Sequence, residues 1–291
     1  MDLSSYVQQR LQWIEDKLSS LTEMTSCPLL LQASRYCLLN PGKRLRPLLV
    51  IAATEALGQD VSKALTPACA IEILHTYSLI HDDLPCMDDD DFRRGKPTLH
   101  TLYPEGQAVL TGDLLLTFAF EVLSQSPDLT DAQIVKLVQI LAIRSGGQGM
   151  IAGQSLDLLA EGKEISIEEL WQIHQAKTGA LLSACLEFGA VITNAPSSAL
   201  HQMTKIGEEI GLAFQIVDDI LDEEGQESLL GKPTFSDVMN KKATSTSLLG
   251  TVKAKELAET LLQSSLDRCR SLEIQDSFLY QLLPRLVYRS Y

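Results

Sequence analysis

Several long segments of the chain place apolar residues three or four positions apart, the spacing that gives an α-helix one apolar face. These positions include Ala68, Ile71, Leu74 and Leu79 in residues 65–83, and Ile206, Ile210, Phe214, Val217 and Leu221 in residues 205–223. A third such segment covers residues 166–192. Ser166 and Glu169 at its start have the spacing of a capping box, in which each side chain bonds the other's backbone N–H. Alternating strand patterns joined by hairpin turns are absent from the sequence.

Turn-forming residues divide these helical segments. They occur at Gly42, between Pro85 and Pro104, at Pro127, at Gly162, between Asn194 and Ser198, and between Gly225 and Phe235. The sequence shows no low-complexity linker, no Pro-rich hinge and no repeat of fixed period. We therefore predict an all-α bundle of about ten helices, forming a single domain over residues 1–291.

The stretch HDDLPCMDDDD, residues 81–91, has six aspartates directly after an apolar helical segment. A buried carboxylate is costly unless it is paired or bound to a metal. Pro85 disfavours helical geometry at the residue before it, so the helix should end near Asp83. The loop that follows can bring Asp88 back beside Asp82. For residues 89–91 we favour a solvated acidic loop.

A second acidic motif, DDILD, covers residues 218–222. Asp218 and Asp222 are four residues apart, so they share one helix face. Oxygen ligands favour Mg²⁺, Mn²⁺ or Ca²⁺, and neither motif has the spacing of a calcium-binding loop. Mg²⁺ is usually held by one or two carboxylates together with substrate phosphates. Two carboxylate clusters therefore predict several Mg²⁺ ions, with Mn²⁺ as the alternative metal, acting on a diphosphate.

The overall charge is acidic, with 24 Lys and Arg against 38 Asp and Glu and a net charge of −14, which argues against nucleic acid or an anionic membrane as partner. Two basic clusters stand out against this background, GKRLRP at residues 42–47 and FRRGKP at residues 92–97. The first cluster opens a predicted helix, whose N-terminus suits phosphate, and arginine offers paired donors to phosphate oxygens. Single arginines could equally neutralise the nearby aspartates. The two clusters together favour phosphate binding.

The six cysteines form no C-x-x-C pair, which is typical of reduced thiols in a reducing compartment. The N-terminal sequence MDLSSYVQQRLQW is too polar for a signal peptide. No apolar run approaches the roughly 20 residues that a membrane span needs. We predict a soluble cytoplasmic protein without a transmembrane segment.

Six motifs occur in an order that resembles the trans-isoprenyl diphosphate synthases, from about Leu30 to Lys242. They are GKRLRP, the acidic stretch at 81–91, FRRGKPT, GQSLDL, KTGALL and FQIVDDILD. DDxxD by itself also occurs in terpene cyclases, but a cyclase has no need of GKRLRP for a second diphosphate. The resemblance implies an isoprenoid synthase fold with a central substrate cavity, usually a homodimer. It also implies Mg²⁺-dependent, head-to-tail condensation of isopentenyl diphosphate with dimethylallyl and then geranyl diphosphate.

The resemblance also implies a role for each matching residue. Metal ions would be held by Asp82, Asp88 and Asp218, with help from Asp157 and Asp222. The allylic diphosphate would be bound by Arg93, Lys177 and Lys232, and isopentenyl diphosphate by Lys43, Arg46, His75 and Arg94. Thr178 and Gln215 would direct oxygen dipoles at the allylic cation, and Lys242 would contribute to substrate binding. Read without the resemblance, Gln154, Asp157, Lys177 and Gln215 would each be ordinary helix-surface residues, and His75 would be a core histidine. His174 and His201 are expected to be structural.

Product length depends on what lies below the first acidic motif. Tyr77 is five residues before Asp82, about 7.5 Å along a helix. With Ser78 beside it, an aromatic ring there would act as a floor and favour the C15 product, farnesyl diphosphate; plain core packing is the alternative. Two other functions are open, a geranylgeranyl or other chain-length synthase and a non-catalytic subunit that binds prenyl diphosphates. The family usually has Ser-Thr-Tyr after the lysine at 242, where this chain has Ala-Thr-Ser.

Overall fold

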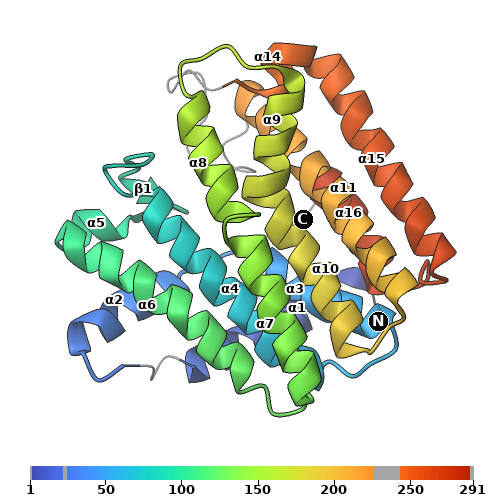
Figure 1. Ribbon diagram of the computed structural model, residues 1–291, viewed down its shortest axis with the longest axis horizontal. Helices are drawn as coiled ribbons and strands as arrows, with labels where there is room; N and C mark the ends of the chain where they lie inside the picture. Colours follow the sequence, from blue (N-terminus) through green and yellow to red (C-terminus); the bar gives the residue numbers. More distant parts are fainter. Residues whose placement is uncertain (1, 22–24, 226–242, 289–291) are drawn as a thin grey trace. The chain divides into compact units, whose positions relative to one another are not determined.

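The computed structural model describes residues 2–21, 25–225 and 243–288 and is built from helices (Figure 1). In chain order they are α1 (Leu3–Ser20), α2 (Pro28–Leu38), α3 (Leu45–Ala56), α4 (Ser62–Asp82), α5 (Leu99–Leu102), α6 (Glu105–Ser124), α7 (Asp131–Ser145), α8 (Met150–Ala160), α9 (Ile167–His174), α10 (Ala180–Ile192), α11 (Ser197–Glu223), α14 (Ser245–Leu249), α15 (Thr251–Ser271) and α16 (Phe278–Tyr288). The all-α prediction is confirmed. The described residues hold fourteen α-helices, twelve of them eight residues or longer, against the ten or so expected. The excess includes α5 and α14, which are too short to show a repeating apolar pattern.

The predicted helix over residues 166–192 is two helices with a π-helical turn between them, η1 (Gln175–Gly179). Its start is as predicted, because Ser166 accepts from the backbone of Glu169 and the Glu169 side chain accepts from Ser166 N. The apolar pattern continues through the turn without a break. The sequence therefore gave no sign of the extra residue that a π-turn inserts.

One hairpin is present in the described chain, where the sequence pattern predicted none. Strand β1 (Phe92–Arg93) pairs antiparallel with β2 (Lys96–Pro97). The connecting residues Arg94 and Gly95 both have positive φ, 54° and 73°, as the tightest hairpin turns require. Strands of two residues are too short for alternation to be visible in the sequence. The hairpin fixes the direction of the FRRGKP motif.

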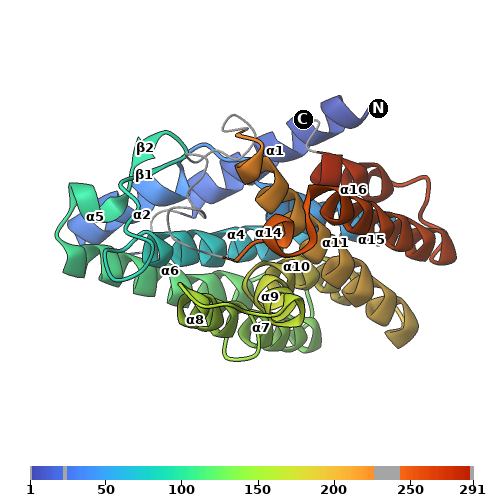
Figure 2. The ribbon, with the colours of Figure 1, turned by 90° about the horizontal axis from the view of Figure 1, so that it is seen from above.

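The described chain forms two compact units, and the single-domain prediction stays a prediction. Unit 1 comprises residues 1–51 and 60–138. Its central helix is α4, which packs against α1, α2 and α6 and is buried over most of its length. Figure 2 shows α4 and α6 running alongside each other. By length and composition alone, α6 is the one described helix that could cross a membrane, a test that core helices of soluble proteins also pass.

Unit 2 comprises residues 52–59 and 139–291. Its longest helix, α11, packs against α10, α15, α16 and η1. Helix α10 is buried on all sides, with only Val191 of its thirteen residues outside the buried set. Two glycines of α11 allow close approach: a side chain at Gly207 would meet the backbone of Ser183, and one at Gly211 would meet Gly179. The second contact positions η1.

None of the six cysteines is in a disulfide in the described part of the chain, and the prediction of reduced thiols stays a prediction. Cys27 and Cys86 are exposed, whereas Cys69, Cys185 and Cys269 are buried. Burial raises the pKa of Cys269 to about 12. The same cause raises the pKa of the half-buried Cys37 to about 12. These groups stay protonated at neutral pH.

Candidate active site

The first acidic motif forms the predicted loop at the end of α4. The helix ends at Asp82, and Asp83 is its C-cap. The backbone N–H of Asp88 donates to the carbonyl of Asp82 at 3.0 Å, while Asp89 N donates to Leu84 O at 3.2 Å. The chain therefore turns back at once, and the backbones of Asp82 and Asp88 lie side by side. This confirms the prediction drawn from Pro85.

Arg93 on β1 lies among the carboxylates of this loop. Its Nε is 2.5 Å from Asp83 Oδ1, and its terminal nitrogen is 3.4 Å from Asp90 and 3.8 Å from Asp82. Burial raises the pKa of Asp83 to about 7, against the opposing effect of Arg93. In the described structure Arg93 thus neutralises aspartates, the alternative raised for single arginines. Its contact with a diphosphate stays a prediction.

The GKRLRP motif divides into a buried arginine and two flanking cations. Arg44 is 2% exposed and has a φ of 45°. Its Nε lies 2.7 Å from Glu15 and its Nη1 3.0 Å from Glu72, and its Nη2 donates to the carbonyls of Leu38 and Asn40. This network fastens the start of α3 to α1 and α4. Sequence reasoning missed Arg44 and Glu72 as a pair, because they are 28 positions apart.

Arg46, in the same GKRLRP motif, contacts His75 on α4. Arg46 Nη1 lies 3.0 Å from His75 Nε2. A guanidinium can only donate, so Nε2 accepts and the proton of the imidazole is on Nδ1. Burial, then the charges of Arg46 and Arg94, lower the pKa of His75 well below its usual value. His75 is therefore neutral, and its buried Nδ1 has no hydrogen-bond partner among the described residues. That N–H is a donor suited to an anionic oxygen.

Arg94 adds a further positive charge to this region of unit 1. Burial comes first among the causes that lower its pKa, and Arg44 and Arg46 also contribute. Gly42 accommodates the Arg94 guanidinium, because a side chain at Gly42 would overlap it. Several guanidinium groups so near one another favour an anion. Lys43 lies between Gly42 and Arg44 in the chain.

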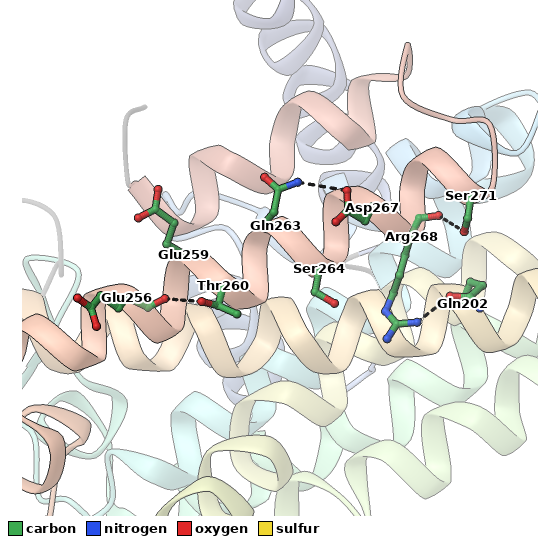
Figure 3. A pocket seen from close by; sticks show the side chains of 9 residues that line it. All are labelled: Gln202, Glu256, Glu259, Thr260, Gln263, Ser264, Asp267, Arg268 and Ser271. Carbon is green, nitrogen blue, oxygen red and sulfur yellow. Dashed lines mark hydrogen bonds between the residues drawn. The ribbon is translucent and has the colours of Figure 1, made fainter.

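Two cavities of different size lie in the two units. A small one of about 40 Å³ in unit 1 is lined by Asp83, Arg93 and Arg94, along with residues of α2, α4 and α5. A larger groove of about 990 Å³ lies on α15 and α11 in unit 2 (Figure 3). None of the predicted site residues lines the larger groove, and Arg268 within it is held by Glu209 and Gln202. The small cavity is the one that belongs to the candidate site.

In unit 2 the π-turn η1 presents the KTG motif. Lys177 Nζ lies 2.8 Å from Asp157 Oδ2 on α8, and Thr178 Oγ1 donates to Gln215 Oε1 on α11 at 2.9 Å. Gly153 allows helix α8 to come this close because it has no side chain. A Cβ at that position would collide with the backbone of Lys177. π-turns are often found at functional sites. The structure thus brings together four residues that the sequence predicted separately.

The middle aspartate of the second motif has a structural role that the sequence did not reveal. Asp219 is 3% exposed, and its Oδ2 accepts from Ser245 N at 2.7 Å and lies 3.1 Å from His174 Nε2. His174 is therefore structural, as expected. Ser245 belongs to the Ala-Thr-Ser that departs from the family pattern, and Thr244 caps α14. The departures are at Ala243 and Ser245, whereas the cap of α14 is Thr244, which the family pattern shares, and the bond to Asp219 uses a backbone N–H that any residue but proline supplies.

Asp218 and Asp222 are the outer aspartates of that motif. Asp218 is half-buried, and Asp222 is 3% exposed. Oδ1 of Asp222 has no hydrogen-bond partner among the described residues, a costly state for a carboxylate unless a cation compensates it. The described residues contain no group of three or more His, Cys, Asp or Glu assembled as a metal site. Carboxylates that leave ligand positions open fit Mg²⁺ held jointly with phosphates.

The other predicted residues lie on α4, on α8 or outside the described residues. Tyr77 is 6% exposed on α4, and Ser78 Oγ donates to His75 O at 2.8 Å. Gln154 lies on α8, next to Gly153. Lys232 and Lys242 lie outside the described residues. The roles of all these residues toward substrate stay predictions.

A family model for polyprenyl synthetases matches residues 27–277. The chain belongs to the polyprenyl synthetase family. Among curated relatives of this family, the farnesyl diphosphate synthase of Bacillus subtilis is 41% identical over 99% of both chains. The farnesyl diphosphate synthase of Haemophilus influenzae is 48% identical over 84% of this chain and 83% of its own.

Solved structures agree with this family assignment. The geranyltransferase of Helicobacter pylori, crystallised with magnesium and an isoprenyl diphosphate, has a TM-score of 0.88 and 34% sequence identity. The similarity covers 100% of this chain and 99% of that one. The expected resemblance to isoprenyl diphosphate synthases is confirmed in both sequence and fold.

Proposed function

We propose that this chain is a prenyltransferase that joins isopentenyl diphosphate head-to-tail to dimethylallyl diphosphate and then to geranyl diphosphate, giving farnesyl diphosphate. The observation that carries the proposal is the 41% identity to the farnesyl diphosphate synthase of Bacillus subtilis, which extends over 99% of both chains. A relationship over the full length supports a shared reaction far better than a single shared motif would. Each addition lengthens the allylic chain by five carbons and releases one diphosphate.

Isopentenyl diphosphate is assigned to the basic region of unit 1. Lys43, Arg46 and Arg94 supply positive charge, and the neutral His75 supplies its unpartnered Nδ1 proton. This mixture suits a diphosphate, because guanidinium groups offer paired donors and a neutral N–H adds a bond without further charge repulsion. The buried Arg44 keeps the flanking cations in place rather than touching substrate.

The allylic diphosphate is assigned to the aspartates together with Arg93, Lys177 and Lys232, and Lys242 is expected to contribute to substrate binding. Asp82, Asp88, Asp157, Asp218 and Asp222 are the residues that would hold Mg²⁺, with Mn²⁺ as the alternative. Bound metal would supply positive charge that neutralises the diphosphate as it leaves. The uncompensated oxygen of Asp222 supports a cation at the second motif.

The chemical step needs no protein base. When the C1–O bond of the allylic substrate breaks, positive charge develops on the allyl group, and the oxygens of Thr178 and Gln215 stabilise it. The hydrogen bond between these two side chains, 2.9 Å long, keeps their dipoles oriented. The double bond of isopentenyl diphosphate then attacks C1. A proton lost from the neighbouring carbon, accepted by the departing diphosphate, restores a double bond.

Product analysis tests the proposal. Purified protein is incubated with isopentenyl diphosphate, geranyl diphosphate and Mg²⁺, with EDTA added to a parallel sample. We expect farnesyl diphosphate in the first sample and none in the second. A longer product would support the geranylgeranyl or other chain-length alternative, while binding of geranyl diphosphate without elongation would support a non-catalytic subunit.

The setting of the enzyme is also part of the proposal. We propose a cytoplasmic homodimer that has no transmembrane segment. The absence of a disulfide among the six cysteines of the described chain supports a reducing compartment. Light scattering after gel filtration should give twice the mass of the 32.0 kDa chain.

A further inference from the structure

The aromatic ring proposed as the floor for the growing product is in contact with a second ring. Tyr77 and His81 lie one turn apart on α4, with their ring centroids 5.1 Å apart and their planes at 79°. Tyr77 is 6% exposed, so its ring has little freedom to move away from this contact. Edge-to-face pairs of this geometry are attractive and favour one relative orientation of the two rings.

His81 is held in turn by α6. Its Nε2 lies 3.0 Å from the carbonyl oxygen of Val109, and because a carbonyl only accepts, Nε2 is the donor. The carboxylate of Asp113 is 3.9 Å from the same nitrogen. Gly112 provides the space for the imidazole, since a Cβ at that position would overlap Nε2 and Cδ2 of the ring. The hydrogen bond to Val109 and the space beside Gly112 therefore fix the position of the His81 ring between α4 and α6.

We infer that His81 is a positioning residue for product length: it supports the Tyr77 ring, and Gly112 is the residue that allows it to do so. The inference rests on the proposed function and deepens it. If Tyr77 stops the allylic chain at fifteen carbons, the ring must resist the end of that chain. The contact with His81, which lies on the same helix and is anchored to α6, fixes the tilt of the Tyr77 ring and so keeps it in place. Without it, the Tyr77 ring can tilt and admit a further five-carbon unit.

Product length separates this role from ordinary packing. A loosened fold or a weaker diphosphate site slows every addition of isopentenyl diphosphate. A displaced floor instead changes the ratio of geranylgeranyl to farnesyl diphosphate at a given extent of reaction. The ratio is therefore the readout that a merely structural role for His81 would leave unchanged.

The experiment uses the full chain with geranyl diphosphate, excess isopentenyl diphosphate and Mg²⁺, and the products are separated by chromatography. The test variants are His81→Ala, which removes the support, and Gly112→Ala, which keeps the imidazole but displaces it. The matched controls are His201→Ala, at an exposed position of α11, and Gly106→Ala, at a position of α6 where a side chain meets no atom within 4 Å. Tyr77→Ala reports whether the ring is a floor at all.

Both test variants should raise the ratio of geranylgeranyl to farnesyl diphosphate about two- to tenfold, the range that corresponds to loss of one aromatic pair. The controls should match the wild type. The inference is overturned if Tyr77→Ala lengthens the product while both test variants keep the wild-type ratio. The inference is also overturned if Tyr77→Ala makes only farnesyl diphosphate. If the wild type itself makes no farnesyl diphosphate, the proposed function is refuted. If His81→Ala does not fold, Gly112→Ala decides.

Discussion

Replacement of Arg44 by methionine should destabilise the protein strongly, although Arg44 is assigned no contact with substrate. The variant leaves Glu72, which is 2% exposed, without its cation, and breaking a buried ion pair on one side costs about 3–5 kcal/mol. The carbonyls of Leu38 and Asn40 also lose a donor, at about 1 kcal/mol in total. Glu15 has a side chain 37% exposed and can turn to water, so it adds little. The expected loss is about 4–6 kcal/mol.

Differential scanning calorimetry measures this loss. For a chain of 291 residues, 4–6 kcal/mol corresponds to a fall in melting temperature of about 6–10 °C. Arg270→Met is the matched control, because Arg270 is an exposed arginine of α15 paired with Asp267, and its loss should leave the melting temperature close to that of the wild type. The double variant Arg44→Met with Glu72→Leu should melt above Arg44→Met alone, since it removes the uncompensated carboxylate. The reasoning is wrong if Arg44→Met melts within about 2 °C of the wild type, or if the second substitution lowers the melting temperature further.

Three further predictions follow from the site. Asp219→Ala leaves the backbone N–H of Ser245 without its acceptor and should cost about 1–3 kcal/mol in urea unfolding; a loss below about 0.5 kcal/mol would show that Asp219 is not an anchor. Gly211→Ala forces η1 away from α11 and should lower kcat/KM about 10–100-fold, while the circular dichroism spectrum stays unchanged. Wild-type kinetics in this variant would show that activity does not need the close approach of η1 to α11. At pH 8 a thiol reagent should modify Cys27 and Cys86 first, because burial keeps the other thiols out of reach or raises their pKa; mass spectrometry of digested peptides would identify any other order.

The sequence predicted best those features that depend on residues close together in the chain. The apolar periodicity predicted the long helices, and Pro85 predicted the end of α4 and the loop that brings the backbones of Asp82 and Asp88 together. Ser166 and Glu169 predicted their capping box. Each of these depends on residues a few positions apart, so the information is contained in a short window.

What the sequence left hidden depends on partners far apart in the chain. Arg44 was one of several cations in a basic motif, and only the fold shows that it is buried against Glu72. Asp219 looked like its neighbour Asp218 until the fold placed it against His174, 45 positions away. Residues of the same type within one motif cannot be told apart by their chemistry. The packing around each of them decides which one has a structural role.

The hairpin in FRRGKP was missed for a different reason. Its strands are two residues long, and the turn uses positive φ at Arg94 as well as at Gly95. Arginine is not a residue from which a left-handed turn is expected. The local preference of the sequence was therefore overruled by the position that Arg94 takes beside Gly42.

The π-turn at Gln175–Gly179 has a consequence for how this protein can change. A five-residue turn holds one residue more than the regular helix on either side of it, so deletion of a single residue there would restore an unbroken α-helix from α9 into α10. Such a chain would gain regular hydrogen bonds and lose the outward displacement that brings Lys177 to Asp157 and Thr178 to Gln215. At this turn, a change that increases the stability of the helix would decrease activity. Selection for a more stable helix would therefore separate Lys177 and Thr178 from their partners.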